Sequence, residues 1–155
     1  MRALFLFALA ATPALAQPPA VCAQQAMVPG FADWGKAGAA DGLAAGRNSI
    51  LRLAPAEALG FTPPLTRAPQ PGTFGGTFPL TIARAGTYRI ALSQGAWIDV
   101  VGAGQRLESA SHAHGPACSG IAKTVSFFLK PGDYLVQLSE SKADAIGAMV
   151  VADVG

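Results

Sequence analysis

The sequence predicts an all-β fold, an antiparallel β-sandwich with an irregular Ala/Gly/Pro-rich N-terminal arm. Three observations predict it. Short runs of β-branched and aromatic residues, separated by turn residues, follow one another after Phe74. No stretch keeps the period of about 3.6 residues that an amphipathic helix shows. Two of the runs also begin with nearly the same turn sequence, and several short strands of this kind are typical of two packed sheets.

The chain begins with the three parts of a cleavable signal peptide. Arg2 supplies a positive start, residues 3–11 form an apolar run, and residues 14–16 give an A-x-A cleavage site before Gln17. The apolar run is shorter than the roughly 20 residues that a membrane-spanning helix needs. We therefore expect residues 1–16 to be removed. The mature protein is then periplasmic or secreted, with no membrane segment after cleavage.

The net charge of the chain limits its possible partners, and its length limits the number of its domains. Without Arg2, the 11 basic residues of the full chain become 10 against 9 acidic residues, a net charge close to +1. Proteins that bind nucleic acid or the membrane surface need a concentrated basic face, and no Lys/Arg cluster occurs here. We therefore expect neither of these partners. The 155-residue chain without its signal peptide has the length of one domain.

Two cysteines, Cys22 and Cys118, remain after cleavage. Export places them in an oxidising compartment, where paired thiols persist as disulfides. A bridge between them would close a loop of about 95 residues, for which the chain-entropy model gives roughly 4 to 5 kcal/mol of stabilisation. We therefore predict a disulfide that ties the N-terminal arm to the loop near Cys118.

Residues 17–73 and 74–155 differ in composition, and we expect them to form one domain. The first segment is an arm rich in Ala, Gly and Pro, and its prolines between positions 63 and 71 interrupt regular structure. Within it, residues 49–53 predict a strand and residues 41–45 a helical turn. The second segment is the sandwich core, with strands predicted at residues 77–82, 87–92, 96–101, 124–129, 134–138 and 146–151.

Two corresponding turns begin two of these strands. The sequence Ala-Gly-Thr-Tyr at residues 85–88 is matched by Pro-Gly-Asp-Tyr at residues 131–134. Gly86 and Gly132 each take the second central position of a type II turn, where φ is positive and glycine is favoured. Because an apolar strand also precedes each turn, each copy predicts a β-hairpin.

Alternation gives each of the two following strands one apolar face. Arg89 and Gln137 point to the opposite side. Two such apolar faces packed together make the core of a sandwich. The residues that share the apolar side are Tyr88, Ile90 and Leu92 in one strand and Tyr134, Val136 and Leu138 in the other.

The pattern of an apolar strand, Ala-Gly-Thr-Tyr or Pro-Gly-Asp-Tyr, and a second apolar strand resembles the bacterial pre-peptidase C-terminal domain, a jelly-roll-like β-sandwich found on secreted enzymes. The resemblance covers roughly residues 74–153. It consists of a hairpin pattern that many sandwiches share, so it implies a jelly-roll-like fold rather than an activity.

Three segments carry a second, narrower resemblance. They are Gly-Thr-Tyr-Arg-Ile-Ala-Leu-Ser at 86–93, Ala-Trp-Ile-Asp-Val at 96–100 and His-Ala-His-Gly-Pro-Ala-Cys-Ser-Gly-Ile at 112–121. These segments resemble a family of small exported bacterial proteins labelled homogentisate 1,2-dioxygenase. Enzymes of that name are longer, cytoplasmic, cupin-type proteins that hold a non-haem iron with two histidines and a glutamate, and this chain matches no complete motif of that kind. The label implies a metal-dependent oxidoreductase.

His112 and His114 are the only histidines of the chain. On an extended segment both imidazoles project to the same side, and together they would chelate a single Fe, Cu or Zn ion. A third ligand would come from Asp99, Glu108 or, as a free thiol, Cys118. The Gly-Pro pair that follows the histidines indicates a turn. The alternative is therefore an exposed polar loop held by the disulfide.

Trp97 and Asp99 form a second candidate site, for a ligand rather than a metal. Alternation places them on the face of their strand opposite Ile98 and Val100. If Ile98 and Val100 face the core, Trp97 is free to stack on a sugar or to anchor a partner beside a carboxylate. We expect instead that the long loop of residues 102–120 folds over Trp97, because large apolar side chains are usually covered.

These residues support two classes of function. The principal prediction is a non-catalytic periplasmic or secreted binding or accessory module, whose partner is a small ligand, a glycan or an envelope protein. The alternative is a small metalloprotein that uses His112 and His114, with the dioxygenase as its most specific form. No catalytic residue is assigned, since the sequence holds neither a G-x-S-x-G elbow nor a glycine-rich phosphate loop between a strand and a helix.

Overall fold

The computed structural model describes residues 22, 24–36, 38–39 and 42–153. The predicted signal peptide and the predicted cleavage before Gln17 lie outside the described residues. Within those residues, no helix is long and apolar enough to cross a membrane. Regular structure there consists of strands and one 3-10 turn, η1 (Ala56–Ala58).

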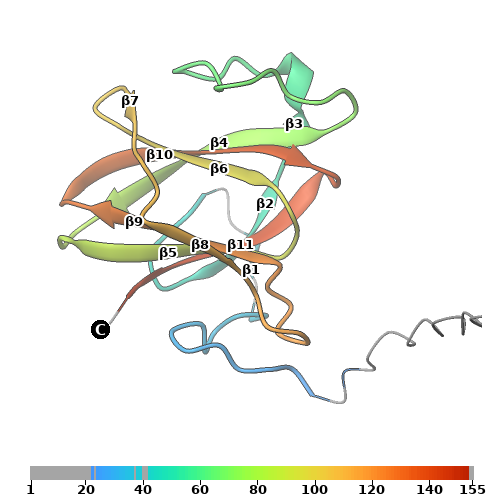
Figure 1. Ribbon diagram of the computed structural model, residues 1–155, viewed down its shortest axis with the longest axis vertical. Helices are drawn as coiled ribbons and strands as arrows, with labels where there is room; N and C mark the ends of the chain where they lie inside the picture. Colours follow the sequence, from blue (N-terminus) through green and yellow to red (C-terminus); the bar gives the residue numbers. More distant parts are fainter. Residues whose placement is uncertain (1–21, 23, 37, 40–41, 154–155) are drawn as a thin grey trace, which may run out of the picture.

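The described strands form two sheets that lie one above the other (Figure 1). Neighbouring strands are antiparallel, except that β1 is parallel to β2. The six-stranded sheet contains, in spatial order, β1 (Gly38–Ala39), β2 (Asn48–Arg52), β11 (Ala145–Ala152), β5 (Gly86–Leu92), β9 (Lys123–Leu129) and β8 (Ser111–His114). The five-stranded sheet contains β3 (Ala54–Pro55), β4 (Phe74–Ile82), β10 (Gly132–Ser141), β6 (Trp97–Gly102) and β7 (Gln105–Arg106). The predicted all-β sandwich is confirmed.

The order of the strands is that of a jelly roll. Strands β2 and β11 pair in the six-stranded sheet, β4 and β10 in the five-stranded sheet, β5 and β9 in the first again, and β6 and β7 in the second. The pairs are thus nested along the chain and alternate between the sheets, as when one long antiparallel ribbon is wound around a core. This winding confirms the jelly-roll-like form of the sandwich.

All six predicted core strands are present, and the strand predicted at residues 49–53 is β2. The helical turn predicted at residues 41–45 is wrong for the part that the structure describes, because Ala45 instead forms an isolated bridge to Val150. The predicted loop of residues 102–120 is also wrong, since β7 and β8 lie within it. The segment of residues 41–45 and the strands β7 and β8 are all short. Segments of this length carry too few residues to show a clear period of hydrophobic residues.

The two predicted hairpins are not hairpins. β4 lies in the five-stranded sheet and β5 in the six-stranded sheet, so the turn between them is a corner that crosses the core. The same holds for β9 and β10. Each of these strands pairs with a distant one, β4 with β10 and β5 with β9. A turn sequence alone does not decide whether the next strand forms a hairpin with the previous one or crosses to the other sheet. A strand with one apolar face buries that face equally well in either sheet.

A tyrosine closes each corner. The Tyr88 hydroxyl donates a hydrogen bond to the Arg84 carbonyl oxygen, at 2.9 Å. The Tyr134 hydroxyl donates to the Lys130 carbonyl oxygen at 2.9 Å and accepts from the Lys130 amide at 3.0 Å. A tyrosine that reaches back to the backbone a few residues upstream is a known device at sandwich corners. The repeated sequence therefore builds the same corner twice.

The type II turns predicted for these corners are also wrong. Gly86 is not among the glycines with positive φ. Gly132 does have a positive φ, but its value of 151° is far from the roughly +80° that a type II turn requires. The physical reason is that the chain at a corner changes sheets instead of folding back beside itself, so the tight reversal of a hairpin turn is not needed.

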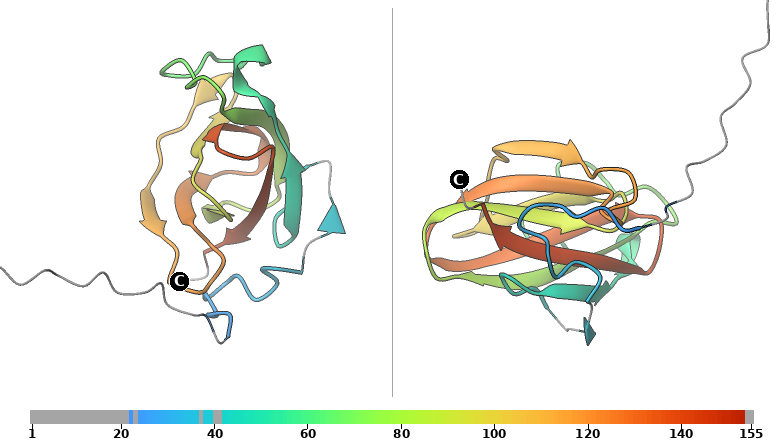
Figure 2. Two further views of the ribbon diagram at one scale, coloured as in Figure 1. Left: turned by 90° about the vertical axis from the view of Figure 1, so that its right-hand side faces the viewer. Right: turned by 90° about the horizontal axis from the view of Figure 1, so that it is seen from below.

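The predicted core faces are confirmed. Tyr88, Ile90 and Leu92 are buried in the main apolar cluster between the sheets, together with Val136 and Leu138. The opposite faces of these strands are covered as well. The N-terminal arm lies across the outer face of the six-stranded sheet, as the right-hand view of Figure 2 shows, and a smaller apolar cluster forms there.

The arm is fixed at its start by the disulfide between Cys22 and Cys118, which confirms the predicted pairing. The amide of Ala26 also donates to the Cys118 carbonyl oxygen at 2.8 Å. Phe31 of the arm is buried against the sheet, with 2% exposure, and the guanidinium of Arg89 lies 5.1 Å from its ring centroid. The side of the strand that carries Arg89 is therefore covered by the arm and is not an open polar face.

A second covering segment lies over the five-stranded sheet. It runs from residue 59 to residue 72 between η1 and β4, seen in green at the top of Figure 1. Gln137 of β10 is only 1% exposed, and its side-chain amide donates to the Thr62 carbonyl oxygen at 3.0 Å. The Arg106 guanidinium donates to the Pro64 carbonyl oxygen. These two bonds hold the proline-rich segment against the sheet.

Candidate functional site

A cleft of about 260 Å³ opens at one edge of the sandwich. It forms because β7 pairs only with Val101 and Gly102, so that β7 leaves the first half of β6 without a neighbour on that side. The six-stranded sheet meanwhile extends through β9 to β8 at the corresponding edge. The cleft is lined by Trp97, Ile98, Ser109, His112, Lys123 and Val125.

Trp97 stands at this cleft and is 44% exposed. The predicted alternation is confirmed, since Ile98 and Val100 are buried in the core. The expectation that residues 102–120 bury Trp97 is wrong. The physical reason is that the end of that segment, β8, pairs with β9 and so joins the opposite sheet. The segment thereby forms the far wall of the cleft and leaves Trp97 uncovered.

Two cationic groups approach the ring of Trp97. The guanidinium carbon of Arg67 lies 5.2 Å from the ring centroid, and the ammonium nitrogen of Lys123 lies 5.4 Å from it. Both are within the range of a cation–π interaction. Arg67 comes from the proline-rich covering segment, and it also forms a 2.6 Å ion pair with Glu140. Sequence patterns did not indicate Arg67 or Lys123, because neither is near Trp97 in the chain.

Lys123 links the two sheets across the cleft. Its ammonium donates a hydrogen bond to the Ala96 carbonyl oxygen at 3.0 Å, immediately before Trp97 in the chain. The side chain is partly buried, and burial lowers the pKa of Lys123 from its usual value because removal from water disfavours the charged form. The ammonium of this cleft-lining side chain is therefore tied to the residue that precedes β6.

Asp99 is paired with Trp97 as predicted, but it does not line the cleft. It is 6% exposed, and its carboxylate accepts a hydrogen bond from the Trp97 indole N–H at 3.3 Å. The same oxygen lies 3.3 Å from Nε of Arg106 in an ion pair. Asp99 thus orients the indole and is neutralised by Arg106, so its role is to position Trp97.

The predicted metal ligands do not assemble around one point. His112 and His114 are exposed on β8, opposite Val125 and Lys123 of β9. This extended strand places both imidazoles on one side, as a chelating pair requires, but only His112 lines the cleft. In the part of the chain that the structure describes, no group of three or more His, Cys, Asp or Glu residues is placed to hold a metal ion.

None of the three candidate third ligands lies in the cleft with His112. Cys118 is in the disulfide and offers no thiolate, and the contacts of Asp99 are with Trp97 and Arg106. Glu108 is exposed, and it does not line the cleft. The structure therefore brings His112 together with Trp97, and it leaves His112 and His114 as a two-imidazole pair.

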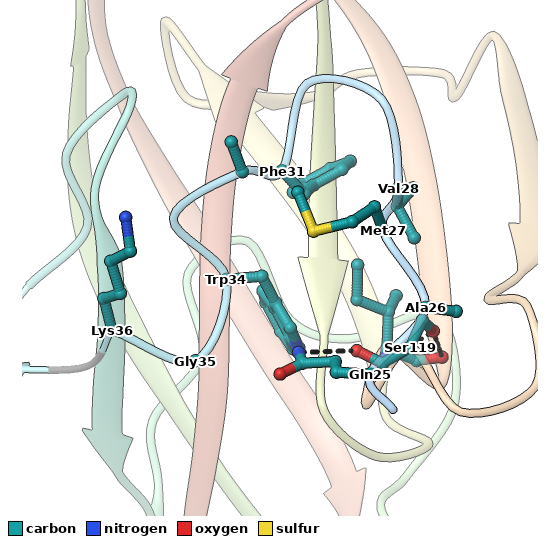
Figure 3. Close-up of a pocket in the computed structure, with 11 residues that line it drawn as sticks. Gln25, Ala26, Met27, Val28, Phe31, Trp34, Gly35, Lys36 and Ser119 are labelled. Carbon is teal, nitrogen blue, oxygen red and sulfur yellow. Dashed lines mark hydrogen bonds between the residues drawn. The ribbon is translucent and has the colours of Figure 1, made fainter. Parts of the chain in front are cut away.

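A second cavity, of about 310 Å³, lies under the N-terminal arm (Figure 3). Phe31 and Trp34 form one wall with their rings edge to face, 6.4 Å apart, and Met27 is 74% exposed. Two polar side chains of the cavity are already bonded within the protein, since the Gln25 amide donates to the Ser119 carbonyl oxygen at 3.1 Å and Lys36 pairs with Asp33 at 2.8 Å. The sequence did not indicate this cavity. We assign it to the packing of the arm.

Comparison of the chain with protein-family models, with curated proteins and with solved structures finds no significant match. The class of the protein therefore rests on its own fold and site. The chain is a disulfide-bonded jelly-roll β-sandwich. At one edge it has a small cleft that presents a tryptophan, a lysine and a histidine.

Proposed function

We propose that this protein is an exported, non-catalytic binding module, periplasmic or secreted, and that its ligand site is the cleft at Trp97. The observation that carries the proposal is the exposure of Trp97 at a cleft that also holds Lys123, His112 and Ser109. Tryptophan combines a large apolar surface with a polar N–H and is enriched where proteins meet ligands. A few polar groups around such a surface fix the orientation of a bound molecule.

The hydrogen bonds at this cleft favour binding over catalysis. The Lys123 ammonium is fixed to the Ala96 carbonyl oxygen, and the Asp99 carboxylate is neutralised by Arg106. A general acid or base must instead be free to exchange a proton with the substrate. Asp99 and the bond from Lys123 to Ala96 position the walls of the cleft, and the remaining N–H donors of Lys123 stay available to a ligand. We expect the ligand to be a glycan, because a sugar presents both C–H surfaces and hydroxyl groups to such a surface.

Fluorescence of Trp97 gives a direct test. Trp34 is the other tryptophan of the chain, so a Trp34→Phe variant reports on Trp97 alone. Titration with a panel of neutral and acidic hexasaccharides is expected to change its emission for at least one sugar. A further Ser109→Ala or His112→Ala change should weaken that response, whereas Phe128→Ala should not, because Phe128 is 59% exposed but lies outside the cleft. A panel that leaves the emission unchanged would reject the proposal.

The export part of the proposal has a separate test. A disulfide between Cys22 and Cys118 is consistent with an oxidising compartment, and the first 16 residues have the form of a signal peptide. The intact mass of the exported protein is expected to correspond to a chain that begins at Gln17. Exported protein that keeps residues 1–16 would reject this part.

A small metalloprotein is the second candidate. The observation in its favour is that His112 and His114 share one side of β8. Protein purified from its native compartment would then contain stoichiometric Fe, Cu or Zn, and the metal would be lost in a His112→Ala/His114→Ala double variant. The dioxygenase label would apply only if that metal were iron. Metal-free protein with unchanged stability would instead favour the binding module.

A further inference from the structure

Lys123 differs from the other cations around Trp97. Arg67 is neutralised by Glu140 and Arg106 by Asp99. Lys123 forms no ion pair with any residue that the structure describes, although it is partly buried and its pKa is lowered by that burial. A partly buried charge without a counter-charge is costly. An anion placed beside the ammonium would reduce that cost.

The hydrogen bonding of Lys123 leaves donors for such an anion. An ammonium has three N–H donors, and the structure gives one of them a partner, the Ala96 carbonyl oxygen. The remaining donors belong to a side chain that lines the cleft. A hydrogen bond from an ammonium to a carboxylate is shorter and stronger than one between neutral groups, so a ligand carboxylate is the natural partner.

The residues that line the cleft also favour a negatively charged ligand. None of these residues is acidic, and His112 contributes an imidazole that can donate a hydrogen bond to a ligand. The two carboxylates linked to this region are already paired, Asp99 with Arg106 and Glu140 with Arg67. Glu108 precedes Ser109 in the chain and is exposed, but it does not line the cleft, so an incoming anion meets no carboxylate on the cleft walls themselves.

Size and surface restrict the ligand further. Small-molecule sites usually measure about 300–1,000 Å³, and this cleft, at about 260 Å³, is smaller than that range. It therefore takes one ring-sized unit rather than a long ligand. Part of the indole remains exposed to contact the C–H groups of such a ring, while Ser109 and His112 offer hydrogen bonds to hydroxyl groups.

From these observations we propose that the cleft binds a carboxylated sugar unit, a uronic acid, with its carboxylate on the ammonium of Lys123 and its ring beside Trp97. This proposal rests on the proposed function and names its ligand class. The same chemistry is available in an acidic polysaccharide and in a free uronic acid. Longer chains bind more tightly than the monomer only if neighbouring units also touch the protein.

Isothermal titration of the disulfide-bonded mature protein with trigalacturonate and with its methyl ester tests the proposal. The ester keeps the sugar ring and removes the charge. We expect trigalacturonate to bind and the ester to bind about tenfold more weakly or worse, the range of one charge-assisted hydrogen bond. Equal affinities would overturn the proposal. The galacturonate monomer, measured alongside, shows whether a free acid or a polysaccharide is the better source.

Variants of Lys123 provide the second test. Lys123→Met should abolish the preference for the acid over the ester, and Lys123→Arg should keep it in part. Lys142→Met is the matched control, because Lys142 is exposed and lies outside the cleft. If Lys123→Met does not fold, the comparison of acid and ester on the natural protein still decides. Binding of neutral sugars alone would overturn this inference and keep the proposed function, whereas no binding of any sugar would overturn both.

Discussion

Gly132 and Gly86 occupy the same place in the repeated corner sequence, yet only one of them needs to be glycine. Each opens the strand that follows its corner, β10 or β5. A Cβ atom added at either glycine meets no other atom within 4 Å. The two positions differ in their backbone, because φ is 151° at Gly132 while Gly86 is not among the residues with positive φ. Replacement by alanine therefore separates backbone strain from steric clash.

The expected magnitudes follow from that difference. Alanine at position 132 is forced into a backbone region that is almost confined to glycine, at a cost of about 1–3 kcal/mol. Both substitutions also reduce the freedom of the unfolded chain, which stabilises the fold by about 0.4–1 kcal/mol where no strain arises. We therefore expect Gly86→Ala to be neutral or stabilising. Gly132→Ala should then be less stable than Gly86→Ala by about 1–3 kcal/mol.

Urea unfolding of the two variants, followed by circular dichroism with the disulfide intact, measures this difference directly. The unfolded-state term is the same for both substitutions, so it cancels when the two variants are compared. Gly132→Val should be less stable still, because a β-branched residue tolerates positive φ worst. Equal unfolding midpoints for Gly86→Ala and Gly132→Ala would refute the idea that backbone strain confines position 132 to glycine.

Two other predictions concern the tyrosines and Lys123. Tyr88→Phe should lower the free energy of unfolding by about 0.5–1.5 kcal/mol, the value of one hydrogen bond. Tyr134→Phe should lower it by at least as much, because the Tyr134 hydroxyl makes two hydrogen bonds. Neutral results in urea unfolding would show that the corners close without the hydroxyl groups. Burial lowers the pKa of Lys123 in the folded state, so the unfolded chain binds more protons in the alkaline range. The stability of the natural protein relative to Lys123→Met should therefore rise as the pH approaches the usual lysine pKa of about 10.4, and a pH-independent difference would contradict the burial of the ammonium.

The candidate site shows how far sequence patterns extend. Alternation placed Trp97 and Asp99 on the face opposite the core, and the structure confirms it. It could not show that Arg106 would neutralise Asp99 or that Arg67 would reach the indole ring. Those contacts depend on how the covering segment lies on the sheet, and long flexible cations carry no periodic pattern that would reveal their partners.

The corner sequences show a similar limit on what local sequence predicts about the fold. The tyrosine motif was visible as a repeat, and the buried sides of the strands that follow it were predicted correctly. The repeat did not reveal whether the next strand pairs with the previous one or crosses to the other sheet. Both choices bury the same face, and the entropy of closing a loop changes only slowly with its length. The distant pairs β4 with β10 and β5 with β9 were therefore not readable from local sequence.

Residue type and short-range periodicity were enough to predict the longer strands, their apolar faces and the pairing of the two cysteines, because each of these is a local property or depends on the number of cysteines. Only the tertiary structure revealed how the strands nest into a jelly roll, that Trp97 is exposed and that Lys123 lies beside it. The backbone of every strand offers the same hydrogen-bonding groups, so the choice of partner is made by the packing of the whole chain. The cleft at Trp97 is a result of that choice, because β7 pairs with only the end of β6 while β8 joins the opposite sheet.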